Sequence, residues 1–141
     1  MLAEDFQSLG DSVDPTEAQE FAKEAVNYPR HLAKTYRHCG NHIMQNILVN
    51  IKVKPRGLCY HWVEDTYKHF QKFSWDSFDL YWAVSDKGEV LAEHNCVLVT
   101  AAGEPFKTGI ILDPWMKAGN LTWYKLKTSD YDWQLRYRLP K

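Results

Sequence analysis

The stretch Arg56-Gly57-Leu58-Cys59-Tyr60-His61-Trp62-Val63 brings a cysteine to the start of a predicted helix. After Cys59, apolar or bulky residues recur with helical spacing at Trp62, Val63, Thr66, Tyr67 and Phe70. The preceding Lys54-Pro55-Arg56-Gly57 has loop composition, so the helix is expected to begin near Leu58. A thiol at this position lies among free backbone N–H groups at the positive end of the helix dipole, which favours the thiolate. The alternative is that Cys59 is a small core residue, as free cysteines often are.

The composition describes one domain without a strong charge bias. A chain of 141 residues can bury its own core, and a net charge of −1 gives no basic excess that would favour nucleic acid. No apolar run is long enough to span a bilayer, and the acidic N-terminus does not resemble a signal peptide. The chain as given is expected to be soluble and cytoplasmic; a cell-envelope or secreted location stays open if a leader has been removed. Cys39, Cys59 and Cys96 are too few for a disulfide scaffold.

The first half of the chain is predicted to be helical. Residues 1–13 are polar and aperiodic and are expected to be a loose N-terminal segment, followed by a single domain over residues 14–141. Asp14-Pro15-Thr16-Glu17 predicts a helix start, with Asp14 as N-cap and Glu17 completing a capping box. Pro29 is expected to end or kink this helix, which then continues towards Gly40. A further short helix is expected through Ile43, Met44, Ile47 and Leu48.

After Phe73 the pattern changes to strands. Residues 78–84 are strand-like and residues 86–88 form a turn. Val90 and Leu91 are expected to open a second strand that continues to Thr100, and two more strands are expected over residues 109–113 and 121–126. No strand or chemistry is assigned to the segment from Tyr131 onwards. The expected fold class is α+β, with N-terminal helices packed on an antiparallel β-sheet.

The two middle strands bring together a second pair of candidate residues. If Thr100 lies opposite Lys107 in an antiparallel hairpin, the same register places His94 opposite Asp113. A carboxylate there can hold one imidazole nitrogen and leave the other free to accept a thiol proton. If the helix of Cys59 packs with its N-terminus over that face of the sheet, the three residues form a nucleophile, a base and an orienting group.

These residues resemble the transglutaminase-like superfamily, within the papain-like cysteine-hydrolase fold. The resemblance covers residues 56–115: Gly57-Leu58-Cys59, then a helix, then His94 leading a strand, then Ile111-Leu112-Asp113-Pro114. More closely, the chain is similar to small uncharacterised bacterial proteins that carry an R-G-L-C-Y-x-W element and a later L-D-P-W. The resemblance implies Cys59 as nucleophile, His94 as general base and acid, and Asp113 as the orienting group.

The chain also departs from the superfamily. An aromatic residue often follows two positions after the histidine, and here that position is Cys96. The backbone N–H of Cys59 is expected to be one oxyanion donor, and Asn46, Gln45 or Asn41 the second, with Asn46 preferred. Trp62 and Trp115 are candidates for the wall of the active cleft. The short domain lacks the additional modules of protein cross-linkers, which favours hydrolysis over transamidation.

The expected activity is thiol-dependent hydrolysis or acyl transfer on a peptide or protein amide, with no cofactor. One alternative is a catalytically inactive domain of the same fold that binds a peptide without cleaving it. Another is a zinc-stabilised domain, because five zinc-capable residues lie in one region: His38, Cys39, His42, Cys59 and His61. Against zinc, Cys59-x-His61 is an unusually tight ligand pair, and His61 is expected on the exposed side of its helix, like His69 near that helix's end. The sequence leaves the oligomeric state open.

Overall fold

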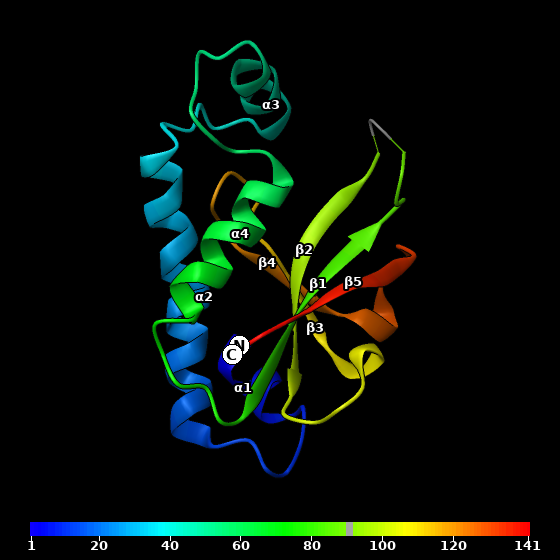
Figure 1. Ribbon diagram of the computed structural model, residues 1–141. Helices are drawn as coiled ribbons and strands as arrows, with labels where there is room; N and C mark the ends of the chain where they lie inside the picture. Colours follow the sequence, from blue (N-terminus) through cyan, green and yellow to red (C-terminus); the bar gives the residue numbers. More distant parts are fainter. Residues whose placement is uncertain (90–91) are drawn as a thin grey trace.

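The computed structural model describes residues 1–89 and 92–141, and these residues form an α+β fold (Figure 1). The helices are α1 (Leu2–Gln7), α2 (Pro15–Thr35), α3 (His42–Asn50) and α4 (Cys59–Phe70). The strands are β1 (Phe78–Ser85), β2 (His94–Ala101), β3 (Ile110–Asp113), β4 (Thr122–Lys125) and β5 (Trp133–Leu139). Two short 3-10 turns, η1 (Phe106–Thr108) and η2 (Leu126–Thr128), follow β2 and β4. The predicted α+β class is confirmed.

The five strands form one antiparallel sheet in the order β4-β3-β2-β1-β5. Every residue of the central strand β2 is buried, because both faces of the sheet are covered. Val97 and Val99 face α2 and α4, which lie on one side of the sheet in Figure 1. Cys96 and Leu98 point to the opposite face. None of the described helices is long and apolar enough to cross a membrane.

The start of α2 follows its sequence signal only in part. Asp14 is the N-cap as predicted, and its carboxylate accepts from the backbone N–H groups of Thr16 and Glu17 at 2.8 and 3.0 Å. Glu17 does not complete a capping box. Its carboxylate accepts instead from the backbone N–H of Ser77 at 2.8 Å, while the N–H of Asp14 donates to the Ser77 hydroxyl at 2.9 Å. The helix start is therefore tied to the segment that leads into β1.

Pro29 lies inside α2 and does not end it. The helix continues to Thr35, although a proline cannot donate the usual backbone hydrogen bond. The buried Pro29 packs against the loop that follows β3. There Gly119 approaches so closely that a Cβ atom would lie 2.8 Å from the Pro29 carbonyl oxygen. The packing of Pro29 against the loop at Gly119 thus offsets the free energy lost with the missing backbone hydrogen bond.

The expectation of a loose segment over residues 1–13 is wrong for its first half. Residues 2–7 form α1, and Phe6 is 0% exposed with its ring 5.1 Å from that of Phe21 and 5.4 Å from that of Phe78. The Trp123 indole also donates to the Asp5 carboxylate at 2.9 Å. Two apolar residues one helical turn apart are too weak a local signal to predict this helix, whose stability comes from the core it joins.

The last strand, β5, was not predicted from the sequence. It pairs with β1, but only Trp133 and Leu139, its first and last residues, are buried. The segment Trp133–Leu139 alternates apolar and polar residues as strands do, so a local signal for β5 was present in the sequence. The prediction that Val90 and Leu91 open the second strand lies outside the described residues, and β2 begins at His94.

Phe21 is the aromatic residue that joins the helices to the sheet. Its ring lies 4.5 Å from that of Phe70 on α4 and 4.9 Å from that of Phe78 on β1. The substitution Phe21→Ala is expected to lower the free energy of unfolding by about 3–5 kcal/mol, because it leaves a cavity between three elements. Urea denaturation followed by circular dichroism measures this. Lys23→Ala, at an exposed position of the same helix, should change it by less than about 0.5 kcal/mol, and a similar loss in both variants would contradict the assignment.

Candidate active site

The turn before α4 places Cys59 at the first residue of the helix. Gly57 has φ +141°, a conformation that side chains disfavour, and a Cβ atom there would lie 2.6 Å from Cγ of Gln45. His61 lies in the first turn of the helix, and its Nδ1 accepts from the backbone N–H groups of Gly57 and Leu58, each at 3.1 Å. The expectation that His61 is exposed is therefore wrong: it is 8% exposed and caps its own helix.

The capping by His61 requires a neutral imidazole with an unprotonated Nδ1. Burial, reinforced by the positive charge of Arg56, lowers the pKa of His61 and favours this form. The N–H groups of Cys59 and Tyr60 belong to the first turn, where no intrahelical acceptor exists. They remain available to stabilise negative charge beside the Cys59 sulfur.

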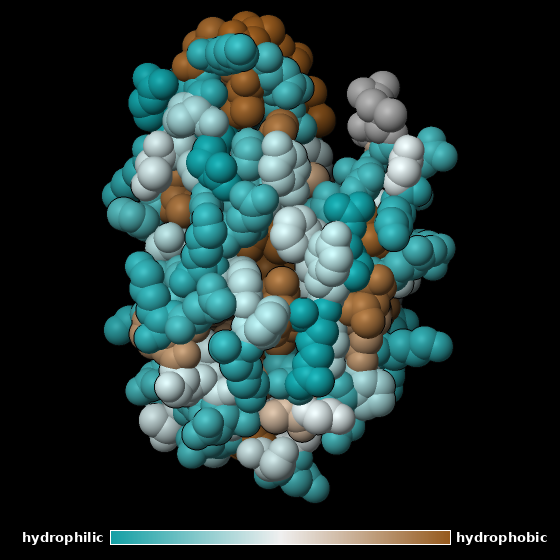
Figure 2. All heavy atoms as spheres, viewed as in Figure 1, coloured by the Kyte–Doolittle hydropathy of each residue, from teal (hydrophilic) through white to brown (hydrophobic). Residues whose placement is uncertain are grey.

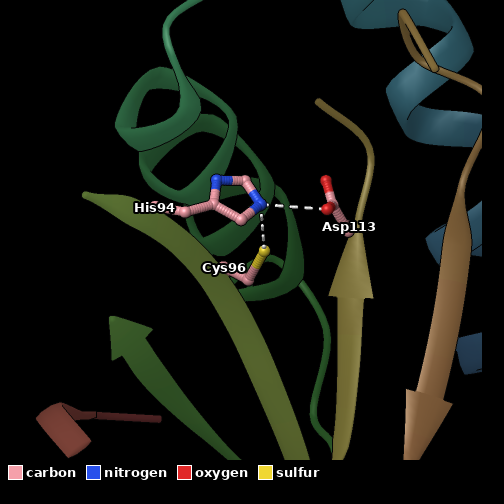
Figure 3. A group of neighbouring side chains, drawn as sticks. All are labelled: His94, Cys96 and Asp113. Atoms are coloured by element: carbon pink, nitrogen blue, oxygen red, sulfur yellow. Dashed lines mark hydrogen bonds and ion pairs between the residues drawn. The ribbon is translucent and has the colours of Figure 1, made fainter. Parts of the chain in front are cut away.

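His94 and Asp113 form a buried pair, as Figure 3 shows. Nε2 of His94 lies 2.9 Å from one carboxylate oxygen of Asp113. The other oxygen accepts from the backbone N–H groups of Trp115 and Met116 at 2.9 and 3.3 Å. Because an ionised carboxylate only accepts, Nε2 carries the hydrogen in this contact. Nδ1 points away from Asp113, is buried and has no hydrogen-bond partner within the described part of the chain.

The register that brings this pair together differs from the predicted one by two residues. Leu98 lies opposite Ile111 rather than Gly109, because η1 lengthens the connection between β2 and β3. A two-residue shift keeps every side chain on its original face of the sheet, whereas a one-residue shift would have moved them all to the other face. His94 and Asp113 therefore still meet, but diagonally rather than directly opposite.

Cys59 reaches His94 from the other side of the sheet. The expectation that α4 covers the face of His94 and Asp113 is wrong, since α4 packs with Val97 on the opposite face. Its first residue nevertheless lies at the end of β2. The Cys59 sulfur is 4.0 Å from the Glu93 carbonyl oxygen and 3.6 Å from Nδ2 of Asn95, the residues on either side of His94. The structure thus brings Cys59, His94 and Asp113 into one region.

The surroundings of Cys59 favour its thiolate. Burial by itself would raise the pKa of the thiol, but the side chains of His94 and Asn95 lower it, and the net pKa lies below the ordinary value of 9.0. Burial would likewise lower the pKa of His94, but Cys96, Asp113 and Cys59 around its ring raise it. These directions favour the ion pair of a Cys59 thiolate and a His94 imidazolium over the neutral pair.

Asn95 is a site residue that the sequence reading missed. Its amide oxygen accepts from the Trp82 indole at 2.8 Å, which orients Nδ2 towards the Cys59 sulfur at 3.6 Å. Alternation along a strand places the neighbour of His94 on the face of α4, so the signal was present in the sequence. It could be read only once the face of the sheet that α4 covers was known.

An open cleft of about 510 Å³ lies beside the sulfur. Of the residues predicted for this region, Asn46 and Trp115 line it, and the Trp115 indole donates to the Asn46 side-chain oxygen at 3.1 Å. Trp62 does not line it: its ring is 1% exposed and packs on Tyr36 in the core. Gln45 is fully buried, and its amide hydrogen-bonds the backbone rather than facing the cleft.

Two of the five candidate zinc ligands, His38 and His61, use a ring nitrogen for other contacts. Nδ1 of His38 accepts from the N–H of Gly40, while His61 caps its helix. Among the described residues, the potential donors that gather are His94, Cys96 and Asp113, within 4.8 Å of one another. These are donor types that zinc accepts. However, Nε2 of His94 already serves Asp113, and burial raises the pKa of Cys96 to about 12, so Cys96 stays a thiol. The arrangement suits proton transfer better than metal binding.

In comparisons with known proteins, no family model, no curated protein and no solved structure matches this chain.

The substitution His94→Gln is expected to raise the pKa of Cys59, because the imidazole that favours the thiolate is lost. Below its pKa a thiol loses reactivity about tenfold per pH unit, so the higher pKa should slow alkylation at pH 7 by about tenfold. The pH dependence of iodoacetamide labelling at Cys59, followed by peptide mass spectrometry, measures both effects. Cys39→Ser, at an exposed thiol, should leave the Cys59 profile unchanged. An unaltered inflection in His94→Gln would rule out His94 as the activating group.

Proposed function

We propose that this protein is a thiol-dependent amide hydrolase or acyl transferase that uses Cys59, His94 and Asp113. The observation that carries the proposal is one imidazole between two groups: Nε2 is held by Asp113, and the ring lies next to a thiol whose pKa it lowers. This is the division of roles in a nucleophile, base and orienting set. The papain-like arrangement, with the nucleophile at a helix start, belongs to the same proposal.

In the first step the Cys59 thiolate attacks the carbonyl carbon of an amide. A carbon–sulfur bond forms, and the carbonyl oxygen takes up the electron pair of its double bond. The N–H group of Cys59 and the side-chain amide of Asn95 are the donors placed to stabilise this oxyanion. Asn95 takes the place for which Asn46 was predicted, because Nδ2 of Asn95 lies 3.6 Å from the Cys59 sulfur.

The intermediate then collapses and the carbon–nitrogen bond breaks. The His94 imidazolium donates the proton on Nδ1 to the leaving nitrogen, which departs as an amine and leaves a thioester on Cys59. The neutral Nδ1 next takes a proton from water as the water oxygen attacks the thioester. The carbon–sulfur bond breaks, the acyl group leaves as a carboxylic acid, and the thiolate–imidazolium pair is restored. An amine in place of water would give transamidation.

The second candidate is a domain that binds a peptide in the same cleft without cleaving it. The cleft favours this candidate because its walls offer both apolar side chains and amide groups. The two candidates differ in whether an acyl group becomes bonded to the Cys59 sulfur.

The test uses an activated ester, p-nitrophenyl acetate, as a minimal acyl donor. We expect a burst of nitrophenol, an acetyl group on Cys59 in trapped protein, and loss of both in Cys59→Ala. His94→Ala should slow acylation by about 10²–10⁴-fold, the usual contribution of general acid–base catalysis. Stopped-flow absorbance and peptide mapping measure the two quantities.

The matched control is His42→Ala. It removes an imidazole that contacts Trp115 on the cleft, with ring centroids 4.5 Å apart, and should leave acylation within about twofold of the unaltered protein. Acetylation spread evenly over Cys39 and Cys59, or an equal rate in His94→Ala, would favour the peptide-binding domain.

A further inference from the structure

We propose that the cleft beside Cys59 binds the acyl side of a peptide through an apolar side chain seated against α3. The inference rests on the proposed thiol chemistry and names its class of substrate. One wall of the cleft is a row of α3 residues, and the opposite wall carries the reactive sulfur. The α3 row consists of Ile43, Asn46, Ile47 and Asn50, and the opposite wall of Leu58, Cys59, Tyr60, Glu93, Asn95 and Trp115.

The α3 residues of the cleft form one continuous face of the helix. Their spacing of three and four residues places them one above another. Both isoleucines are largely exposed, Ile43 at 54% and Ile47 at 49%. Figure 2 shows apolar surface gathered over α3, in contrast to the mostly polar surface around it. A gathered apolar surface that adjoins a cleft indicates a binding site, whereas single exposed apolar residues do not.

This face is held towards Cys59 by polar contacts. Gln45, the one buried residue of α3, donates to the backbone oxygen of Arg56 at 2.9 Å, just before the turn that leads to Cys59. From the other side, the Trp115 indole donates to the Asn46 oxygen at 3.1 Å, two residues after Asp113. The helix is thus tied to both segments that carry the proposed reactive groups, and its isoleucines stay outside the core.

The charges of the cleft select against a charged side chain in the substrate. Besides Cys59, whose proposed thiolate is paired with the His94 imidazolium, Glu93 is the one charged lining residue within the described chain. Its carboxylate is occupied by Arg136 at 2.7 Å and by the N–H of Gly88 at 3.1 Å. A lysine or glutamate of the substrate would lose water in the cleft without gaining a free partner. An apolar side chain would instead gain contact with Ile43 and Ile47.

The amide side chains of the cleft suit a peptide backbone. Asn46 uses its oxygen for Trp115, so its Nδ2 remains to donate to a substrate carbonyl. Asn50, one turn further along α3, offers both a donor and an acceptor. Alternating apolar and amide groups along one wall match an extended peptide, in which side chains and backbone amides alternate.

The test compares three peptidyl chloromethyl ketones that differ only in carrying leucine, lysine or glutamate on the acyl side. The Cys59 thiolate displaces chloride from each, forming a carbon–sulfur bond. The leucine reagent should label Cys59 about tenfold faster than the other two, the ratio expected for burying one apolar side chain. Iodoacetamide is the reference, because it reports the thiol without requiring the cleft.

Two variants on α3 separate the cleft from general surface effects. Ile47→Asp changes a lining residue, and Met44→Asp changes a residue of nearly the same exposure, 48% against 49%, that does not line the cleft. Ile47→Asp should slow the leucine reagent at least about fivefold relative to iodoacetamide, and Met44→Asp should not. Dividing the labelling rate of the leucine reagent by that of iodoacetamide cancels any change in the reactivity of Cys59 itself.

Equal rates for the three reagents, or an equal loss in both variants, would overturn the substrate assignment. The second result would mean that α3 acts as a general apolar surface for another partner. Failure of the proposed function has a different signature: iodoacetamide would label Cys59 no faster than Cys39 in the unaltered protein. The two failures are therefore distinguishable in one set of reactions.

Discussion

The arrangement of the site depends on the buried amide of Gln45. Its Nε2 donates to the backbone oxygens of Tyr36 and Arg56 at 3.2 and 2.9 Å, and its oxygen accepts from the N–H of Cys39 at 3.1 Å. Each of these backbone groups would otherwise be left without a partner, at a cost of about 1–3 kcal/mol where buried. One side chain thereby fixes the end of α2, the position of α3 and the turn before α4. Gly57 is part of the same constraint, since a side chain there would collide with Gln45.

Arg56 secures the other side of this turn. Its guanidinium pairs with Asp65 at 3.0 Å and with Glu64 at 2.9 Å, two turns along α4, and the Tyr36 hydroxyl also donates to Asp65. The Arg56 side chain is about one-third exposed, so each ion pair contributes little free energy by itself. Their effect is positional: the turn is held at Arg56 by both the amide of Gln45 and the acidic residues of α4. Cys59 consequently starts the helix at a fixed place.

The sequence predicted those parts of the fold that depend on contacts between neighbouring residues. The Asp14 cap and the helix beginning at Cys59 follow from side chains that contact their own neighbours. The failures involve distant contacts. Helix α1 depends on Phe6 entering the core, β5 on pairing with β1, and the Glu17 carboxylate on reaching Ser77. The contacts of Phe6 and Glu17 cannot be read from a window of the sequence, because their partners lie far along the chain. For β5, the alternation of Trp133–Leu139 was a local signal that was missed.

The predicted register of β2 and β3 was wrong by two residues, yet His94 and Asp113 still meet. The position of His94 in the sheet explains why this residue also reaches Cys59. Asp113 lies on one face of the sheet and α4 on the other, so a side chain in the middle of β2 can reach only one of them. His94 is the first residue of the strand, where the sheet no longer separates the two faces. Cys96 lies two residues further along the strand, and its sulfur is 3.4 Å from Nε2 of the same imidazole. It is buried on the face of the sheet that carries Asp113. Two cysteines thus flank one histidine. Burial and the Asp113 carboxylate raise the pKa of Cys96, whereas the side chains of His94 and Asn95 outweigh burial at Cys59 and lower its pKa.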